Sequence, residues 1–129
     1  MPKVKQISAW VEDRPGMLGR VADALGEKKV DIRAFMAAVM DRRGFVRVVV
    51  DKPALARRIF SEHGWQTTVD DLVEVAIPDR PGSLGRVADR LGAAGINVEY
   101  AYLGAARSAR TVNLYLAVRD PAAALKALR

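Results

Sequence analysis

A stretch of fifteen residues occurs twice in this chain, and it constrains the possible architecture more than any other feature. Residues 12–26 read EDRPGMLGRVADALG and residues 78–92 read PDRPGSLGRVADRLG, so the two copies differ at only three positions. The similarity continues at the same offset of 66 residues, where Val30-Asp31-Ile32 matches Ile96-Asn97-Val98. A repeat of this period predicts two structural units of similar fold. We place the first unit at residues 1–70 and the second at residues 71–129.

The pattern within each unit predicts the order β-α-β-β-α-β. A segment with alternating apolar residues is followed by a turn, an amphipathic helix, two further strands and a second helix. This order predicts an α+β fold of two ferredoxin-like units, each with an antiparallel sheet and with its helices on one face. Residues 65–69 supply a fourth strand to the first unit. The chain ends at Arg129 before any counterpart, so we expect the second unit to lack its last strand.

Proline, glycine and histidine predict where the helices begin and end. Pro15 and Pro81 suit the first position of a helix, because that position does not need the missing N–H. Gly26 and Gly92 are expected to supply the left-handed residue that commonly ends a helix. His63 lies near the end of a helical pattern, and we expect it to be a C-terminal cap rather than a catalytic group.

Composition argues against catalysis and against a metal centre. The chain has no cysteine and a single histidine, which leaves no thiolate ligand, no cysteine nucleophile and no histidine cluster. No nucleophile and base stand at a recognisable spacing, so we expect neither catalytic residues nor a cofactor. No apolar run reaches the roughly 20 residues of a membrane span, and no secretory signal is evident. We therefore expect a cytoplasmic protein that does not contact the membrane.

The net charge of +6 raises the possibility of a nucleic-acid partner. Other ferredoxin-like domains bind RNA on the open face of the sheet. Here the basic residues occur as scattered pairs among acidic ones, and the aromatic strand motif of those domains is absent. RNA binding is therefore the less favoured alternative, and any nucleic-acid binding is expected to be weak and without sequence preference.

Both copies of the repeat resemble the ACT domain. The resemblance rests on Asp-Arg-Pro-Gly-x-Leu at the first strand-to-helix turn and on Gly-Ile-Asn-Val at residues 95–98, and it extends over essentially the full chain. It implies a non-catalytic regulatory protein that binds an amino acid or another small effector where two ACT units meet. It further implies that a metabolic enzyme or regulator is the partner. The alternative is an interaction module that assembles in the same way but has lost ligand binding.

The turn residues are the first candidates for ligand binding. A glycine-containing turn at a helix N-terminus offers unpaired N–H groups to a ligand carboxylate, while a nearby carboxylate faces the ammonium group. For Asp13 and Asp79 the alternative role is to cap the helix, and for Arg14 it is simple exposure to solvent. The candidates in the two turns are Asp13, Arg14, Pro15, Gly16, Met17 and Leu18, and Asp79, Gly82, Ser83 and Leu84.

The residue before the second strand differs between the units. In ACT domains an Asn at this position often contacts the ligand, and the second unit has Asn97 there, although a turn or edge role is also open for it. The first unit has Asp31, whose carboxylate only accepts hydrogen bonds. If each site joins one unit's turn to the other unit's second strand, one site combines residues 13–17 with Asn97. The other combines residues 79–83 with Asp31, where two carboxylates would repel a ligand carboxylate. We therefore favour the Asn97 site, and a cationic ligand or metal ion is the alternative occupant of the other.

An exposed strand edge predicts self-association. If the two units join through their second strands, the alternating strand at residues 72–77 is left uncovered. An uncovered edge is a template for pairing with another chain. We therefore expect a homodimer or a larger assembly.

Overall fold

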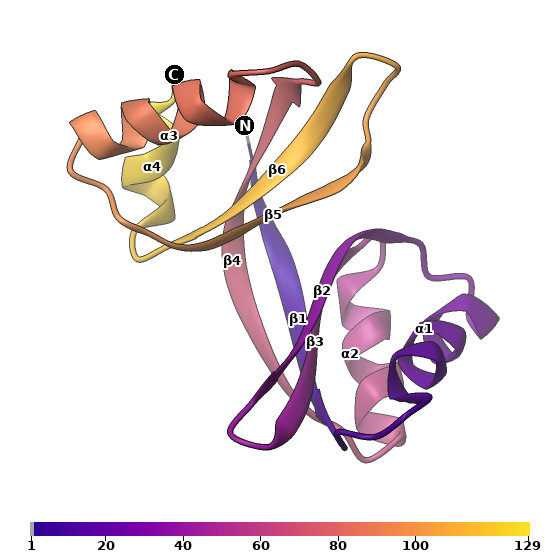
Figure 1. Cartoon of the computed structure of the whole chain (residues 1–129). Coiled ribbons are helices and arrows are strands. Elements are labelled where there is room, and N and C mark those ends of the chain that lie inside the picture. The colour runs from indigo at the N-terminus through magenta and orange to yellow at the C-terminus, as the bar shows by residue number, and fades with distance from the viewer. Residues whose placement is uncertain (1) are drawn as a thin grey trace. The chain divides into compact units, whose positions relative to one another are not determined.

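A computed structural model describes residues 2–129, and its contacts divide the chain into two compact units (Figure 1). The first unit comprises Lys5–Asp70. The second unit comprises Asp71–Arg129 together with residues 2–4. Along the chain the two units therefore divide between residues 70 and 71, and residues 2–4 join the second unit.

The first unit has two helices over a four-stranded sheet. Its hydrogen-bonded strand order is β2-β3-β1-β4, and its core lies between the helices and one face of the sheet, around Ile7, Val48 and Phe60. Ile7 and Ala9 of β1 face this core, and Gln6 and Ser8, which alternate with them, are also buried. The elements are β1 (Lys3–Val11), α1 (Met17–Glu27), β2 (Ile32–Met40), β3 (Arg43–Val50), α2 (Pro53–Glu62) and the beginning of β4 (Gln66–Pro78).

The second unit repeats this arrangement with the remainder of β4. Its strand order is β5-β6-β4, and its separate core includes Val73, Leu91 and Leu116. Its own elements are α3 (Ser83–Ala93), β5 (Val98–Ala106), β6 (Thr111–Val118) and α4 (Pro121–Ala127). The ferredoxin-like α+β fold predicted for both units is therefore confirmed.

The boundary between the units lies inside a strand. The sequence predicted separate strands at 65–69 and 72–77, whereas β4 runs unbroken from Gln66 to Pro78. Its first residues are the fourth strand of the first unit and its later residues are the first strand of the second. A continuous strand explains why the sequence has no glycine- or proline-rich linker at this point.

The beginning of β1 takes the place beside β4 that a fourth strand of the second unit would occupy. The chain indeed has no strand after α4, but the backbone N–H of Glu74 donates to the carbonyl oxygen of Pro2 at 3.0 Å. On its other side β4 pairs with β6 from Val73 to Pro78. The prediction that residues 72–77 form an uncovered edge is therefore wrong, because residues 2–4 cover part of that edge.

The second strands do not join the units within one chain. In the strand order, β2 ends the sheet of the first unit and β5 ends the sheet of the second. The expectation that these two strands meet inside the chain is therefore wrong. The two shared strands, β1 and β4, occupy the positions next to each other instead.

The helix ends correct several predictions. Pro15 and Pro81 lie in turns, since α1 begins at Met17 and α3 at Ser83, whereas Pro53 and Pro121 do occupy first helical positions. Gly26 and Gly92 lie within helices, and the left-handed residues beyond those helices are Lys29 (φ 59°) and Gly95 (φ 74°). His63 is the predicted C-terminal cap of α2, and its Nδ1 lies 2.9 Å from the carbonyl oxygen of Ile59.

Candidate functional site

The β1–α1 turn of the first unit is open at its glycine. Gly16 is the N-cap of α1 and has φ +90°, a backbone conformation that side chains with a Cβ rarely adopt. Within residues 2–129, no side chain caps the first turn of α1, so Asp13 does not have the capping role considered from the sequence. A Cβ added to Gly16 would meet no described atom within 4 Å. Space is therefore free beside Gly16, next to the N-terminus of α1.

A pocket of about 250 Å³ adjoins this turn. The turn contributes Asp13, Arg14, Met17 and Leu18, and the facing wall comes from residues 37–39 near the end of β2. Arg14 is exposed, and its Nε donates to Oε2 of Glu12 at 2.8 Å. Four of the six candidates in this turn thus line one pocket, which holds acidic and basic groups beside an apolar wall.

Pro15 and Gly16 complete the turn without lining that pocket. Both are exposed at the surface. Their contribution is to the backbone: they let the chain leave β1 at Val11 and enter α1 at Met17 within a few residues.

The corresponding turn of the second unit has an arginine beside its glycine. Gly82 has the same φ of +90°, but Nη1 of Arg86 lies 3.4 Å from the position that a Cβ on Gly82 would occupy. Ser83 is 4% exposed, and its hydroxyl has no hydrogen-bond partner among the described residues. Asp79 and Leu84 are exposed, and the backbone N–H of Asp79 donates to the carbonyl oxygen of Arg110 at 2.7 Å. The two turns therefore share a backbone conformation but differ in the side chain that lies beside the glycine.

Asp31 and Asn97 both stand just before a second strand, in different surroundings. The Asp31 N–H donates to Oδ1 of Asp51 at 2.9 Å, and the Asp51 N–H donates back to the Asp31 carbonyl oxygen at 3.2 Å. Asn97 instead lines a pocket of about 440 Å³ with Glu99, Arg119 and Asp120. In the first unit, the backbone of Asp31 is therefore hydrogen-bonded to Asp51. In the second unit, the Asn97 amide shares a pocket with the Arg119 guanidinium.

Arg119 and Glu99 were missed by the sequence analysis. Arg119 occupies the repeat position that Asp51 has in the first unit, 68 residues earlier. This exchange of an acid for a base was the signal in the sequence. Asp120 is the N-cap of α4 and accepts from the Ala123 N–H at 3.1 Å, so its carboxylate is already engaged.

In the first unit, Asp31 lies far from the β1–α1 turn of the same unit. Asp31 precedes the first residue of β2, whereas the turn pocket is lined by residues 37–39 toward the other end of that strand. At about 3.3 Å per residue, these positions are roughly 20 Å apart. A site that joins this turn to the residue before a second strand therefore needs a strand from another unit.

The described residues show no constellation typical of catalysis. His63 is bonded to Ile59 and stacks on Trp65 at a ring-centroid distance of 4.7 Å. Residues 2–129 contain no group of three or more His, Asp and Glu side chains that could hold a metal ion. In the same range, no helix is long and apolar enough to cross a membrane.

Comparison with known families agrees with this architecture. A family model described as an ACT domain pair matches residues 2–110. The chain belongs to the ACT domain pair family. No curated protein matches the sequence.

Solved structures of ACT domain pairs share the fold of the whole chain. Protein BT0572 from Bacteroides thetaiotaomicron is 25% identical with a TM-score of 0.87, over 98% of this chain and 86% of that one. The ligand-free regulatory subunit of aspartate kinase from Thermus thermophilus is 19% identical with a TM-score of 0.72, over 99% and 95%. The corresponding subunit from Thermus flavus is 21% identical with a TM-score of 0.63, over 96% and 89%. At this identity, the kinase subunits establish a shared fold.

Proposed function

We propose that this ACT domain pair is a non-catalytic regulatory sensor that binds an amino acid at the β1–α1 turn of its first unit. The observation that carries the proposal is the pocket at this turn, where no described atom lies within 4 Å of the Cβ position of Gly16, whereas Arg86 lies 3.4 Å from that of Gly82. The N–H groups at the start of α1 suit the ligand carboxylate. The exposed carboxylate of Asp13, in the wall of the same pocket, suits the ammonium group.

A second copy of the chain would complete this site. The end strands β2 and β5 each carry an exposed apolar residue opposite a core residue, since Phe35 pairs with Val48 and Leu103 with Leu114. The exposed fractions of the large apolar side chains on these two strands are Phe35 52%, Val39 56%, Met40 49% and Leu103 52%. Exposed apolar residues on strands at the end of a sheet favour association. We propose a homodimer in which β2 of one copy lies antiparallel to β5 of the other.

This pairing gives Asn97 a role in the proposed site. In an antiparallel pair, the beginning of one strand lies beside the end of the other. Asn97 precedes β5, so in one copy it would approach residues 37–39 of β2 in the other, next to the turn pocket. Arg119, which lines the same pocket as Asn97, would then add a cation close to the ligand carboxylate.

The regulated partner is proposed to be a metabolic enzyme. This rests on the likeness to the regulatory subunits of aspartate kinase, which are separate chains of similar length. The competing function is an interaction module without a ligand, which is favoured by the same apolar edges. The two functions differ in whether a small molecule stabilises the protein.

A thermal-shift survey of the twenty amino acids tests the proposal. A ligand at 100 times its Kd stabilises the folded protein by about 2.7 kcal/mol, which corresponds to several degrees in Tm. We expect at least one amino acid to give this shift, Asn97→Ala to remove it and Asp31→Ala to retain most of it. A loss with Asp31→Ala but not with Asn97→Ala would contradict the choice of site. If no amino acid shifts the Tm at saturation, the interaction module replaces the sensor.

Mixing two inactive variants tests whether the site is shared between copies. Asp13→Ala and Asn97→Ala are each expected to bind poorly when alone. In a mixed dimer, one site regains both native residues, so an equimolar mixture should recover about a quarter of the sites. Calorimetric titration of the mixture measures this recovery. Light scattering must show that the mixture is dimeric, and the variants must be allowed to exchange subunits. If no binding is then recovered, Asp13 and Asn97 either belong to a site within one chain or do not contact the ligand.

A further inference from the structure

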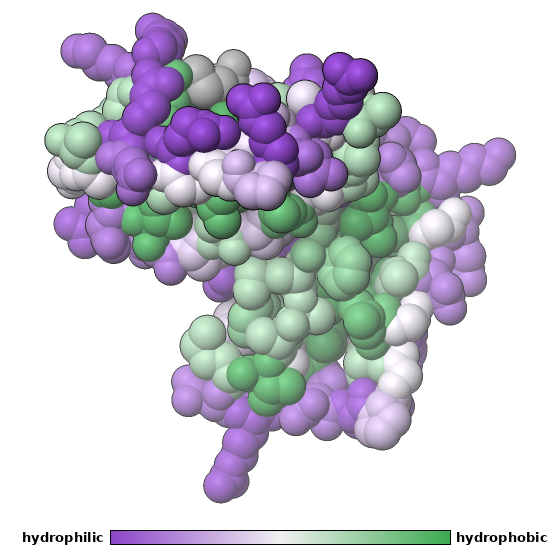
Figure 2. Space-filling view, turned by 45° about the horizontal axis from the view of Figure 1, so that its top comes forward, coloured by the Kyte–Doolittle hydropathy of each residue, from purple (hydrophilic) through white to green (hydrophobic). Residues whose placement is uncertain are grey.

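An apolar cavity lies directly beside the turn pocket of the first unit. It has a volume of about 370 Å³ and lies between α1 and the strands β2 and β3. Its walls include Leu18, Gly19, Ala22, Phe35 and Val48. Figure 2 shows green apolar residues gathered over the lower part of the visible face. Every one of its lining side chains is apolar, so it has no means of binding a charged or hydrogen-bonding group.

The cavity and the turn pocket are adjacent. Leu18 and Val46 line both of them. One side of these two residues therefore faces Asp13 and Arg14, and the other side faces apolar carbon atoms. A ligand with a charged end at the turn would reach the cavity with its other end.

We infer that the effector is an amino acid with an apolar side chain of the size of leucine, methionine or phenylalanine. This inference rests on the proposed function and specifies its ligand class. The charged groups of the ligand lie at the turn of residues 13–16, and its side chain fills the cavity against Phe35 and Val48. A polar side chain in the same place would lose its hydrogen bonds to water without replacement, which weakens binding.

Gly19 determines the room available for that side chain. It lies within α1, lines the cavity, and a Cβ added to it would meet no described atom within 4 Å. Gly85 is its counterpart in the second repeat and also has open space around it within α3. The chain therefore offers a matched pair of helical glycines, of which one lines the proposed side-chain cavity.

Calorimetric titration with L-leucine and L-asparagine measures the side-chain preference. The two side chains have nearly the same shape and differ in polarity. L-leucine is expected to bind at least about tenfold more tightly, because the asparagine amide would be buried in the apolar cavity without hydrogen-bond partners. L-phenylalanine and L-methionine serve as further probes of size.

Gly19→Leu tests the position of the side chain. Leucine is a better helix former than glycine, so the variant is expected to fold, which its circular dichroism and Tm will verify. Its side chain would occupy the cavity, so L-leucine binding should fall by about 100-fold or become undetectable. Gly85→Leu makes the same change in α3 and should bind as the unmodified protein does. Gly19→Ala, which adds only one carbon atom, should retain most of the binding.

The outcomes separate this inference from the function on which it rests. If L-asparagine or a charged amino acid binds as tightly as L-leucine, or if Gly19→Leu binds normally, the apolar ligand class is wrong while the sensor function stands. If no amino acid binds, the sensor function and the apolar ligand class are both wrong. If Gly19→Leu instead converts the dimer to a monomer without affecting ligand affinity, a side chain of the second copy fills the cavity and the inference is overturned.

Discussion

The two units contain nearly the same fifteen-residue repeat, yet the surroundings of their turns differ. Gly16 and Gly82 share the same backbone conformation, and each is followed four residues later by an arginine. Arg86 lies 3.4 Å from the Cβ position of Gly82, whereas no described atom lies within 4 Å of that of Gly16. Nearly the same local sequence therefore builds the same turn twice but does not decide which side chain lies beside it.

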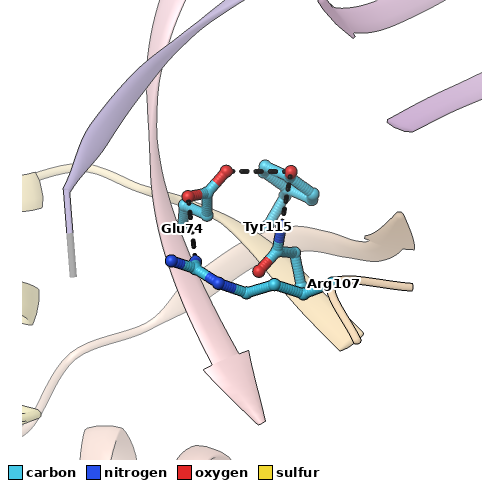
Figure 3. A network of polar contacts seen from close by, with 4 residues as sticks. Glu74, Arg107 and Tyr115 are labelled. Carbon is cyan, nitrogen blue, oxygen red and sulfur yellow. Dashed lines mark hydrogen bonds and ion pairs between the residues drawn. The ribbon is translucent and has the colours of Figure 1, made fainter. Parts of the chain in front are cut away.

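The sheet faces away from the helices also differ at equivalent positions. Ser8 pairs with Arg47 in the first unit, and Glu74 pairs with Tyr115 at the matching place in the second. The Tyr115 hydroxyl donates to Oε2 of Glu74 at 2.9 Å, and Nη1 of Arg107 lies 3.9 Å from Oε1 (Figure 3). The guanidinium of Arg47 instead lies 4.7 Å from the centre of the Phe45 ring. The duplication thus preserved the strand register while the polar chemistry diverged.

The largest expected difference between the units concerns their second helices. Phe60 and Leu128 occupy the same repeat position and are both buried. Phe60→Ala should lower the free energy of unfolding by about 3–5 kcal/mol, because it leaves a large cavity in a closed core. Leu128→Ala should cost about 2 kcal/mol, since it removes a smaller side chain that lies just beyond the short helix α4.

Urea unfolding monitored by tryptophan fluorescence measures these costs. Both tryptophans, Trp10 and Trp65, lie in the first unit, and circular dichroism follows both units. Equal costs for Phe60→Ala and Leu128→Ala would show that the short helix α4 is as firmly packed as α2, contrary to this expectation.

An intermediate effect is expected where the two sheet faces differ. Tyr115→Phe removes the hydroxyl that bonds the nearly buried Glu74 carboxylate, and it should cost about 1–3 kcal/mol. Ser8→Ala is the matched change in the first unit. The Ser8 hydroxyl is buried without a hydrogen-bond partner in the described chain, so its removal should be neutral or slightly stabilising. Thermal unfolding of both variants decides the point, and a larger cost for Ser8→Ala would refute it.

The smallest expected effect concerns how the second helices begin. Asp120 caps α4 through its bond from the Ala123 N–H, whereas Lys52 occupies the N-cap of α2 without a side-chain cap. Asp120→Ala should therefore cost about 1 kcal/mol and Lys52→Ala only a few tenths. The difference in Tm between the two variants measures the contribution of the cap. A Tm for Asp120→Ala equal to that of Lys52→Ala would indicate that α4 is held by packing alone.

Much of the fold was predictable because its signals are local. The repeat at residues 12–26 and 78–92, the alternating apolar residues and the change to helical spacing all lie within short segments. Such patterns specify which faces must be buried, and this leaves few arrangements for a β-α-β-β-α-β chain. The candidates of the β1–α1 turn are likewise neighbours in sequence, so finding Asp13, Arg14, Met17 and Leu18 around one pocket required no knowledge of distant contacts.

Other features depended on groups far apart in the chain, and only the tertiary structure decided them. Residues 2–4 lie beside β4 through the bond between Pro2 and Glu74, and the Asp31 backbone is tied to Asp51. Arg86 lies beside Gly82, whereas the arginine at the same position of the first repeat does not lie beside Gly16. The repeat sequence does not predict this difference. The sequence by itself determined two ACT units and the turn that each would carry. Which glycine has an arginine beside it was decided only in the tertiary structure, because side-chain direction leaves no periodic trace in the sequence.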